Sequence, residues 1–151
     1  MSNEDESRVN RVTSGSLFEA EIGYCRAIAS GGWIFVSGTT GYDCDTMVMP
    51  DDVVAQCRNA LGTIERALAD LGAGMRDVVR VRYIVPNPGD WPLCWPVTRA
   101  VFGAHPPAAT MISAGLQLPE MKIEIEAQAL HPLDAGQPMR HMSPRSSGAE
   151  T

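Results

Sequence analysis

The sequence lacks the features of a membrane protein and of a nucleic-acid-binding protein. No apolar run approaches the ~20 residues that a helix needs to span a bilayer. Lys and Arg total 12 against 18 Asp and Glu, which gives a net charge of −6. Because phosphate groups are bound by clusters of basic side chains, this balance disfavours a nucleic-acid partner. The first residues, MSNEDESRVNRV, contain no apolar segment typical of a signal peptide, so we expect a cytoplasmic protein with no membrane partner.

Metal-binding and disulfide motifs are also missing. The sequence has four cysteines, which are Cys25, Cys44, Cys57 and Cys94. No two of them form a C-x-x-C pair, and in a chain without a secretion signal we expect free thiols. The three histidines are His105, His131 and His141, and they are far apart. No group of these residues has the spacing of metal ligands, so we expect no metal site.

Length and composition indicate one domain with flexible ends. The chain has 151 residues, of which 44% are hydrophobic, and this is enough to bury a core. Residues 1–15 are polar, and residues 132–151 combine Pro, Gly, Ser and charges with few large apolar groups. Such segments bury too little surface to offset their ordering entropy. We therefore expect a folded domain at 16–131 between two flexible segments.

Hydrophobic periodicity predicts the element order β-β-β-α-β-α-β-β. CRAIAS and WIFVSGTTG flank Gly31-Gly32, a pattern typical of a β-hairpin. In 51–74 the apolar residues recur at spacings of three and four, which predicts a helix, with Asp51 or Asp52 as its N-cap. The other expected elements are a strand at 16–21, a strand at 77–85 in which Val79 points to the same side as Val81, a helix at 91–103, and strands at 109–118 and 121–130.

This order predicts an α+β domain in which two helices cover one face of a mixed sheet. The other face carries no helix. In the last strand Ile123, Ile125 and Ala127 point one way, while Glu124 and Glu126 point the other way. The uncovered face is partly apolar, and this indicates self-association.

Four motifs in this order resemble the Rid/YjgF family of reactive-intermediate deaminases, formerly also labelled endoribonuclease L-PSP. They are GGWIFVSGTTG, VVAQCRNALGTIERALADLGAGMRDVVRVRYIV, PPAATM and LPEMKIEIEAQAL. The resemblance covers about three quarters of the chain, from Phe18 to Leu130. It implies a chorismate-mutase-like fold, a homotrimer whose bare sheet faces form a central barrel, and ligand clefts between subunits. It also implies hydrolysis of enamines and imines such as 2-aminoacrylate to 2-oxo acids and ammonia, without a metal or organic cofactor.

The resemblance assigns roles to several positions. Glu124 matches the carboxylate that holds the attacking water. The SG pair of the family is present as Ser37-Gly38, which either offers backbone donors to a ligand or, at Gly38, forms a bulge at the end of a strand. In the deaminases, an arginine after a Pro-Ala pair binds the substrate carboxylate through its guanidinium. Here the pair is Pro107-Ala108 and the next residue is Ala109, so the arginine is absent.

Three further positions of the expected cleft differ from the deaminase pattern. Met111 replaces a cysteine and Trp95 replaces an asparagine. An aromatic cleft residue falls at Tyr24 or at Cys25, depending on where the gap is placed. A bulky indole at Trp95 either narrows the pocket or makes it less polar, which favours a less polar ligand than a short amino acid derivative.

Two arginines inside strands are candidates to replace the missing guanidinium. Either Arg26 or Arg82 binds the substrate carboxylate from a different strand, or Arg82 forms an ordinary ion pair with Glu124 or Glu126. Glu124 is likewise either a water-binding carboxylate or a strand carboxylate that is solvated or paired with Lys122 or an arginine. Three functions stay open: an imine deaminase, a non-catalytic or small-molecule-binding homotrimer, and an enzyme that uses the same clefts for another substrate.

Overall fold

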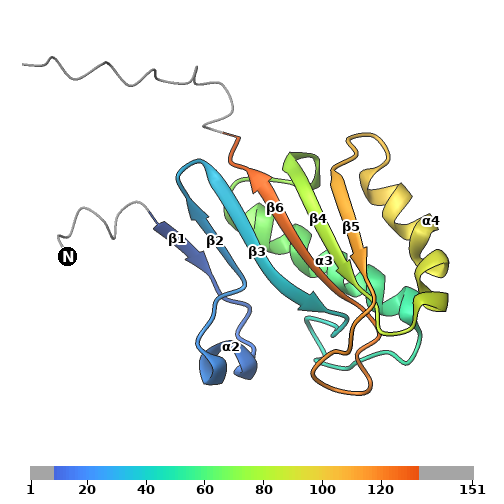
Figure 1. The fold of residues 1–151 in the computed structure, drawn as a ribbon. Helices are drawn as coiled ribbons and strands as arrows, with labels where there is room; N and C mark the ends of the chain where they lie inside the picture. Colours follow the sequence, from blue (N-terminus) through green and yellow to red (C-terminus); the bar gives the residue numbers. More distant parts are fainter. Residues whose placement is uncertain (1–8, 133–151) are drawn as a thin grey trace, which may run out of the picture.

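The computed structural model describes residues 9–132, which form a six-stranded mixed sheet with the order β1-β2-β3-β6-β4-β5 (Figure 1). All neighbouring strands are antiparallel except β4 and β5, which are parallel. The strands are β1 (Val9–Val12), β2 (Ala27–Ser30), β3 (Trp33–Thr40), β4 (Val78–Ile84), β5 (Ala108–Ile112) and β6 (Glu124–Leu130). The helices are α2 (Leu17–Ile22), α3 (Val53–Asp70) and α4 (Trp91–Phe102), with 3-10 turns η1 (Met75–Asp77) and η2 (Pro88–Asp90).

Helices α3 and α4 lie on the same side of the sheet, and the core is between them and the strands (Figure 1). Within the described residues, no helix covers the opposite sheet face, which exposes Trp33, Phe35 and Ile112, each at about two fifths of its full accessibility. The predicted α+β architecture, with one covered face, is confirmed. Among residues 9–132, no helix is long and apolar enough to cross a membrane.

The predicted hairpin and the predicted long helix are both confirmed. Gly31 and Gly32 have positive φ angles of 60° and 82°, and Ser30 pairs with Trp33 across this two-residue turn. Such a turn requires φ > 0 at both central positions, which glycine adopts without strain. Asp52 caps α3, because its side chain accepts a hydrogen bond from the Ala55 N–H at 2.9 Å.

The expected strand at 16–21 is wrong, because this segment forms α2. The Ser16 hydroxyl accepts a hydrogen bond from the Phe18 N–H at 3.2 Å, and Gly23 ends the helix with a φ of 94°. These two caps fix a short helix where the apolar pattern alone suggested a strand. The first strand is instead Val9–Val12, inside the segment expected to be flexible, and it pairs with β2. The expected C-terminal flexible segment, which includes His141, lies outside the described residues apart from position 132.

The expected placement of Val79 on the same side of the strand as Val81 is also wrong. Pairing of β4 with β6 shifts between Val78 and Arg80, so Val78 is buried at 3% exposure while Val79 is 36% exposed. A bulge inserts one residue and reverses the alternation on one side of it. The alternation predicted for β6 is confirmed, since Ile125 and Ala127 are buried.

Gln56 ties the loop before β6 to α3. The side chain is fully buried, and its Nε2 donates to the carbonyl oxygens of Pro50 at 2.6 Å and Glu120 at 2.9 Å. Its Oε1 accepts from the Lys122 N–H at 2.9 Å. One buried amide thus provides partners for three backbone groups of this region. It also fixes where β6 begins.

Replacing Gln56 with Leu should lower the free energy of unfolding by about 2–4 kcal/mol, because three backbone groups lose the hydrogen bonds that this buried amide makes. Urea denaturation at neutral pH measures this difference. The exposed Glu65 of the same helix provides the control, and Glu65→Gln should change the free energy by less than about 0.5 kcal/mol. Equal stability of the Gln56→Leu variant and the parent chain would show that the amide is not a structural clamp.

Candidate functional site

The Glu124 carboxylate faces a small hollow at the end of the sheet. This cavity, called here the Glu124 hollow, has a volume of about 110 Å³. The lining residues that matter for the site are Tyr24, Arg26, Gly38, Tyr42, Met47 and Glu124. Glu124 is the first residue of β6 and lies opposite Thr40 of β3. Its neighbours Ile123 and Ile125 are buried in the core, so Glu124 points away from it.

A bulge in β3 creates the space for this carboxylate. Val36 pairs with Ala127 and Thr39 pairs with Ile125, so three residue steps on β3 match two on β6. Gly38 lies inside the bulge. A Cβ atom built on Gly38 would lie 2.1 Å from Glu124 Oε1. The carboxylate therefore occupies the place that a side chain at position 38 would fill.

Burial makes Glu124 a stronger base than an ordinary glutamate. Desolvation raises the pKa of its carboxyl above the usual 4.5, and the charge of Glu126 adds to this effect. The positive charge of Arg26 acts in the opposite direction and lowers the pKa, but burial dominates. A half-buried carboxylate with a raised pKa, facing a cavity, is suited to hold water and accept its proton.

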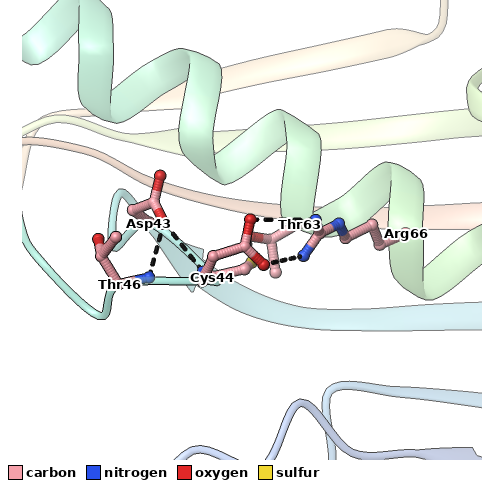
Figure 2. A network of polar contacts seen from close by, with 6 residues as sticks. Asp43, Cys44, Thr46, Thr63 and Arg66 are labelled. Atoms are coloured by element: carbon pink, nitrogen blue, oxygen red, sulfur yellow. Dashed lines mark hydrogen bonds and ion pairs between the residues drawn. The ribbon is translucent and has the colours of Figure 1, made fainter.

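The loop after β3 forms one wall of the hollow through Tyr42, Cys44 and Met47. Asp43 Oδ1 accepts hydrogen bonds from the backbone N–H groups of Asp45 and Thr46, both at 2.9 Å, and these bonds lower the Asp43 pKa (Figure 2). Such a turn is typical of an aspartate followed by small polar residues.

Two contacts attach this loop to α3. Asp45 forms an ion pair with Arg66 at 3.3 Å, and Cys44 Sγ lies 2.7 Å from Thr63 Oγ1 (Figure 2). The hydrophobic pattern contained no signal for this loop. The only sequence signal that could have located its turn is the aspartate at position 43.

Ser37 makes hydrogen bonds to the backbone beside its strand. Its hydroxyl donates to the Cys25 carbonyl oxygen at 2.7 Å, and its N–H donates to the Arg26 carbonyl oxygen at 3.0 Å. Both bonds hold β3 against the residues that precede β2. The predicted role of Ser37 in ligand binding stays a prediction, whereas Gly38 lines the hollow directly.

Arg82 lies outside the Glu124 hollow. Its Nη1 is 2.8 Å from Glu126 Oε1, and the two residues are opposite each other in the β4–β6 pairing. Arg82 therefore makes one of the two ion pairs expected for it, within a separate depression that Phe35 and Gln128 also line. Its predicted role in substrate binding remains a prediction.

The remaining predicted site residues form a second group on the covered side of the sheet. Trp95 and Ala109 line a mainly apolar depression between α4 and β5, called here the tryptophan hollow, which also includes Trp91, Tyr83 and Phe102. The rings of Tyr83 and Trp91 pack with centroids 4.4 Å apart. Met111 neighbours this group on β5 and packs against the core. Both Trp95 and Ala109 are exposed.

The two groups do not meet within one chain. Glu124 is on β6, Ala109 is on the edge strand β5, and β4 lies between these strands. Ala109 pairs with the buried Val81, whereas Glu124 pairs with Ile84 on the opposite face. Within residues 9–132, no three His, Cys, Asp or Glu side chains form a group that could hold a metal ion.

The family model described as Endoribonuclease L-PSP matches residues 15–131. The chain belongs to this family. Its fold is similar to the crystal structure of Rv2704 from Mycobacterium tuberculosis, a YjgF/YER057c/UK114-family member, with a TM-score of 0.74 and 39% identity over 81% of this chain and 98% of that chain.

Curated family relatives include proteins with and without an assigned activity. An uncharacterized protein of Streptomyces coelicolor, SCO2049, is 32% identical over 104 residues, which are 69% of this chain and 78% of the relative. A 2-iminobutanoate/2-iminopropanoate deaminase of Escherichia coli is 29% identical over 110 residues, which are 71% of this chain and 86% of the relative. Family membership in the Rid/YjgF group, predicted from the motifs, is confirmed.

Replacing Gly38 with Ala should displace the Glu124 carboxylate without unfolding the chain. The new methyl group would overlap Glu124 Oε1, and the flexible carboxylate arm can move away toward solvent. The Glu124 pKa should then fall toward its ordinary value, which carbon-detected NMR titration of the carboxyl measures. Gly62→Ala is the matched control, because no atom lies within 4 Å of its added Cβ. An unchanged Glu124 pKa in the Gly38→Ala variant would contradict this geometry.

Replacing Glu124 with Gln should increase stability more at pH 7 than at pH 4. Because the folded-state pKa is raised, the native state binds the proton more tightly than the unfolded state, so stability falls as pH rises from the unfolded to the folded pKa. Glutamine at position 124 does not ionise, so the variant does not lose this stability as pH rises. Urea denaturation of both proteins at the two pH values measures the difference, and a gain that is equal at both would exclude a raised pKa.

Proposed function

We propose that this protein hydrolyses the carbon–nitrogen bond of small imines and their enamine tautomers, with Glu124 as the residue that positions and deprotonates water. The observation that carries this proposal is the half-buried Glu124 carboxylate, with its raised pKa, in a cavity opened by Gly38. The printed name of the Escherichia coli relative, a 2-iminobutanoate/2-iminopropanoate deaminase, supports the same reaction class.

The reaction needs water and one residue that moves protons. Glu124 accepts a proton as the water oxygen attacks the imine carbon, and the carbon–nitrogen double bond becomes a single bond. Glu124 passes this proton to nitrogen, which gives a carbinolamine; the hydroxyl proton of the carbinolamine then moves to nitrogen through the same carboxylate, the remaining carbon–nitrogen bond breaks, and ammonia leaves. The carbon keeps the oxygen as a carbonyl group, so a 2-imino acid becomes a 2-oxo acid. An enamine such as 2-aminoacrylate enters after tautomerising to its imine.

We propose a homotrimer with ligand clefts between subunits as the functional assembly. Two features support it. The uncovered sheet face exposes Trp33 and Phe35, a large apolar area for a surface that meets only water. The Glu124 hollow and the tryptophan hollow are also separated within the chain, and a cleft between neighbouring subunits could combine one from each.

A second candidate, an enzyme acting on a different and less polar substrate, is favoured by the composition of the tryptophan hollow. Ala109 brings no charge to this depression, and the exposed indole of Trp95 gives it an apolar wall. A pocket built this way favours an apolar substituent on the ligand. In such an enzyme Glu124 would keep its role toward water while the preferred side chain of the substrate would differ.

A coupled assay tests the proposed reaction. A lyase that releases 2-aminoacrylate is combined with the purified protein, and loss of the imine is compared with its spontaneous hydrolysis. The parent chain should accelerate this loss, and Glu124→Gln should lower kcat by about 100-fold or more. Glu65→Gln, which alters an exposed carboxylate of α3, should keep the parent rate. Decay at the spontaneous rate, with 2-iminobutanoate as well as 2-iminopropanoate, would refute the deaminase proposal.

A further inference from the structure

Arg26 is a buried cation with few partners. The residue is 8% exposed, and its Nη2 donates a single hydrogen bond, to the Gly38 carbonyl oxygen at 3.1 Å. Nε is buried and has no hydrogen-bond partner among the residues that the structure describes. A guanidinium has five N–H donors, so most of those of Arg26 have no acceptor in the described part of the chain. The Tyr24 ring, with its centroid 5.4 Å from the guanidinium carbon, gives the charge only partial compensation.

No carboxylate among residues 9–132 forms an ion pair with Arg26. In the described part of the chain the ion pairs join Arg66 to Asp45 and Arg82 to Glu126. Glu124 and Arg26 line the same hollow, and the charge of Arg26 lowers the Glu124 pKa, so the two groups are neighbours without being bonded. Burying an unpaired cation is costly, and an anionic ligand would remove that cost.

The geometry points to Arg26 as the residue that binds the substrate carboxylate, in place of the arginine that is missing at Ala109. This inference rests on the proposed function and names its substrate class as short 2-imino carboxylates. Both groups meet at Gly38, where Arg26 donates to the carbonyl oxygen and Glu124 lies against the Cα atom. In a 2-imino acid the carboxylate and the imine carbon are directly bonded. One small ligand can therefore contact the guanidinium while its imine carbon receives water from Glu124.

Arg82, the second arginine that could bind the carboxylate, has a different environment. Arg82 already has a carboxylate partner at 2.8 Å, and it lines a depression that does not include Glu124. Its Nε is also buried without a hydrogen-bond partner among residues 9–132, so an unpaired Nε alone does not distinguish the two side chains. What distinguishes Arg26 is the shared hollow with Glu124 and the absence of an ion pair.

The test separates carboxylate binding from catalysis. The full-length chain is titrated with 2-oxobutyrate, a stable acid of the product class, and with its uncharged amide, and the dissociation constants are measured by NMR. The variants are Arg26→Met, which removes the charge, Arg26→Lys, which keeps the charge without the planar fork, and Arg82→Met. Arg76→Met changes an exposed arginine of η1 and serves as the matched control.

We expect the parent chain to bind 2-oxobutyrate more tightly than the amide, and Arg26→Met to weaken binding of the acid at least about tenfold. Arg26→Lys should recover only part of this loss because it cannot form a bidentate contact, while Arg76→Met should bind as the parent does. Should Arg26→Met fail to fold, the Arg26 Nε–H resonance of the parent chain gives the same answer, because it should shift on adding the acid and not on adding the amide.

Two results would overturn the assignment. The first is an unchanged affinity in Arg26→Met, or a loss confined to Arg82→Met, and the second is a parent chain that binds the acid no better than the amide. Imine turnover is measured separately on the parent chain. If the acid binds in a way that depends on Arg26 but imines are not turned over, the deaminase proposal is refuted and the carboxylate site stands. If imines are turned over but binding of the acid does not depend on Arg26, the deaminase proposal stands and the role of Arg26 is refuted.

Discussion

The antiparallel pairing of β3 with β6, and the extra β3 residue within it, is the constraint on which the site depends. On both sides of the bulge the register is regular, so Val36 and Ala127 remain in the core beside Thr39 and Ile125. The bulge itself places Gly38 beneath the Glu124 carboxylate and turns its carbonyl oxygen toward Arg26. A sheet without this irregularity would keep the core but would lose the space in which the two charges meet.

Elements with a single buried face could be predicted from the sequence. The apolar stripe of α3 and the alternation of β6 report one core-facing side, and both were located correctly. The helix at 16–21 could not be predicted from the apolar pattern, because the Ser16 and Gly23 caps stabilise a helix in a segment whose short apolar pattern predicts a strand. Val79 was placed on the wrong face because a bulge depends on the partner strand, which the local pattern does not contain.

The candidate site was predictable only in part. Glu124 and Gly38 follow from the resemblance to the deaminases, and the structure brings them into contact. The choice between Arg26 and Arg82 did not follow, since the sequence pattern predicts both arginines inside strands, whereas Arg26 lies one residue before β2. Only the three-dimensional register shows that Arg82 faces Glu126, and only the fold shows that Arg26 is buried without a carboxylate. Which carboxylate lies opposite an arginine depends on how the strands pair, and it cannot be deduced from neighbouring residues in the chain.

The clamp made by Gln56 has a consequence for how the site forms during folding. The amide of a residue in α3 binds the backbone of Glu120 and Lys122, which are 64 and 66 positions away in the chain, just before Glu124. Contacts of such long range form only after loop-closure entropy has been overcome, and they tend to appear late. During synthesis, β3 and α3 leave the ribosome well before β6. The Glu124 carboxylate and the Gly38 bulge therefore meet only when β6 pairs with β3.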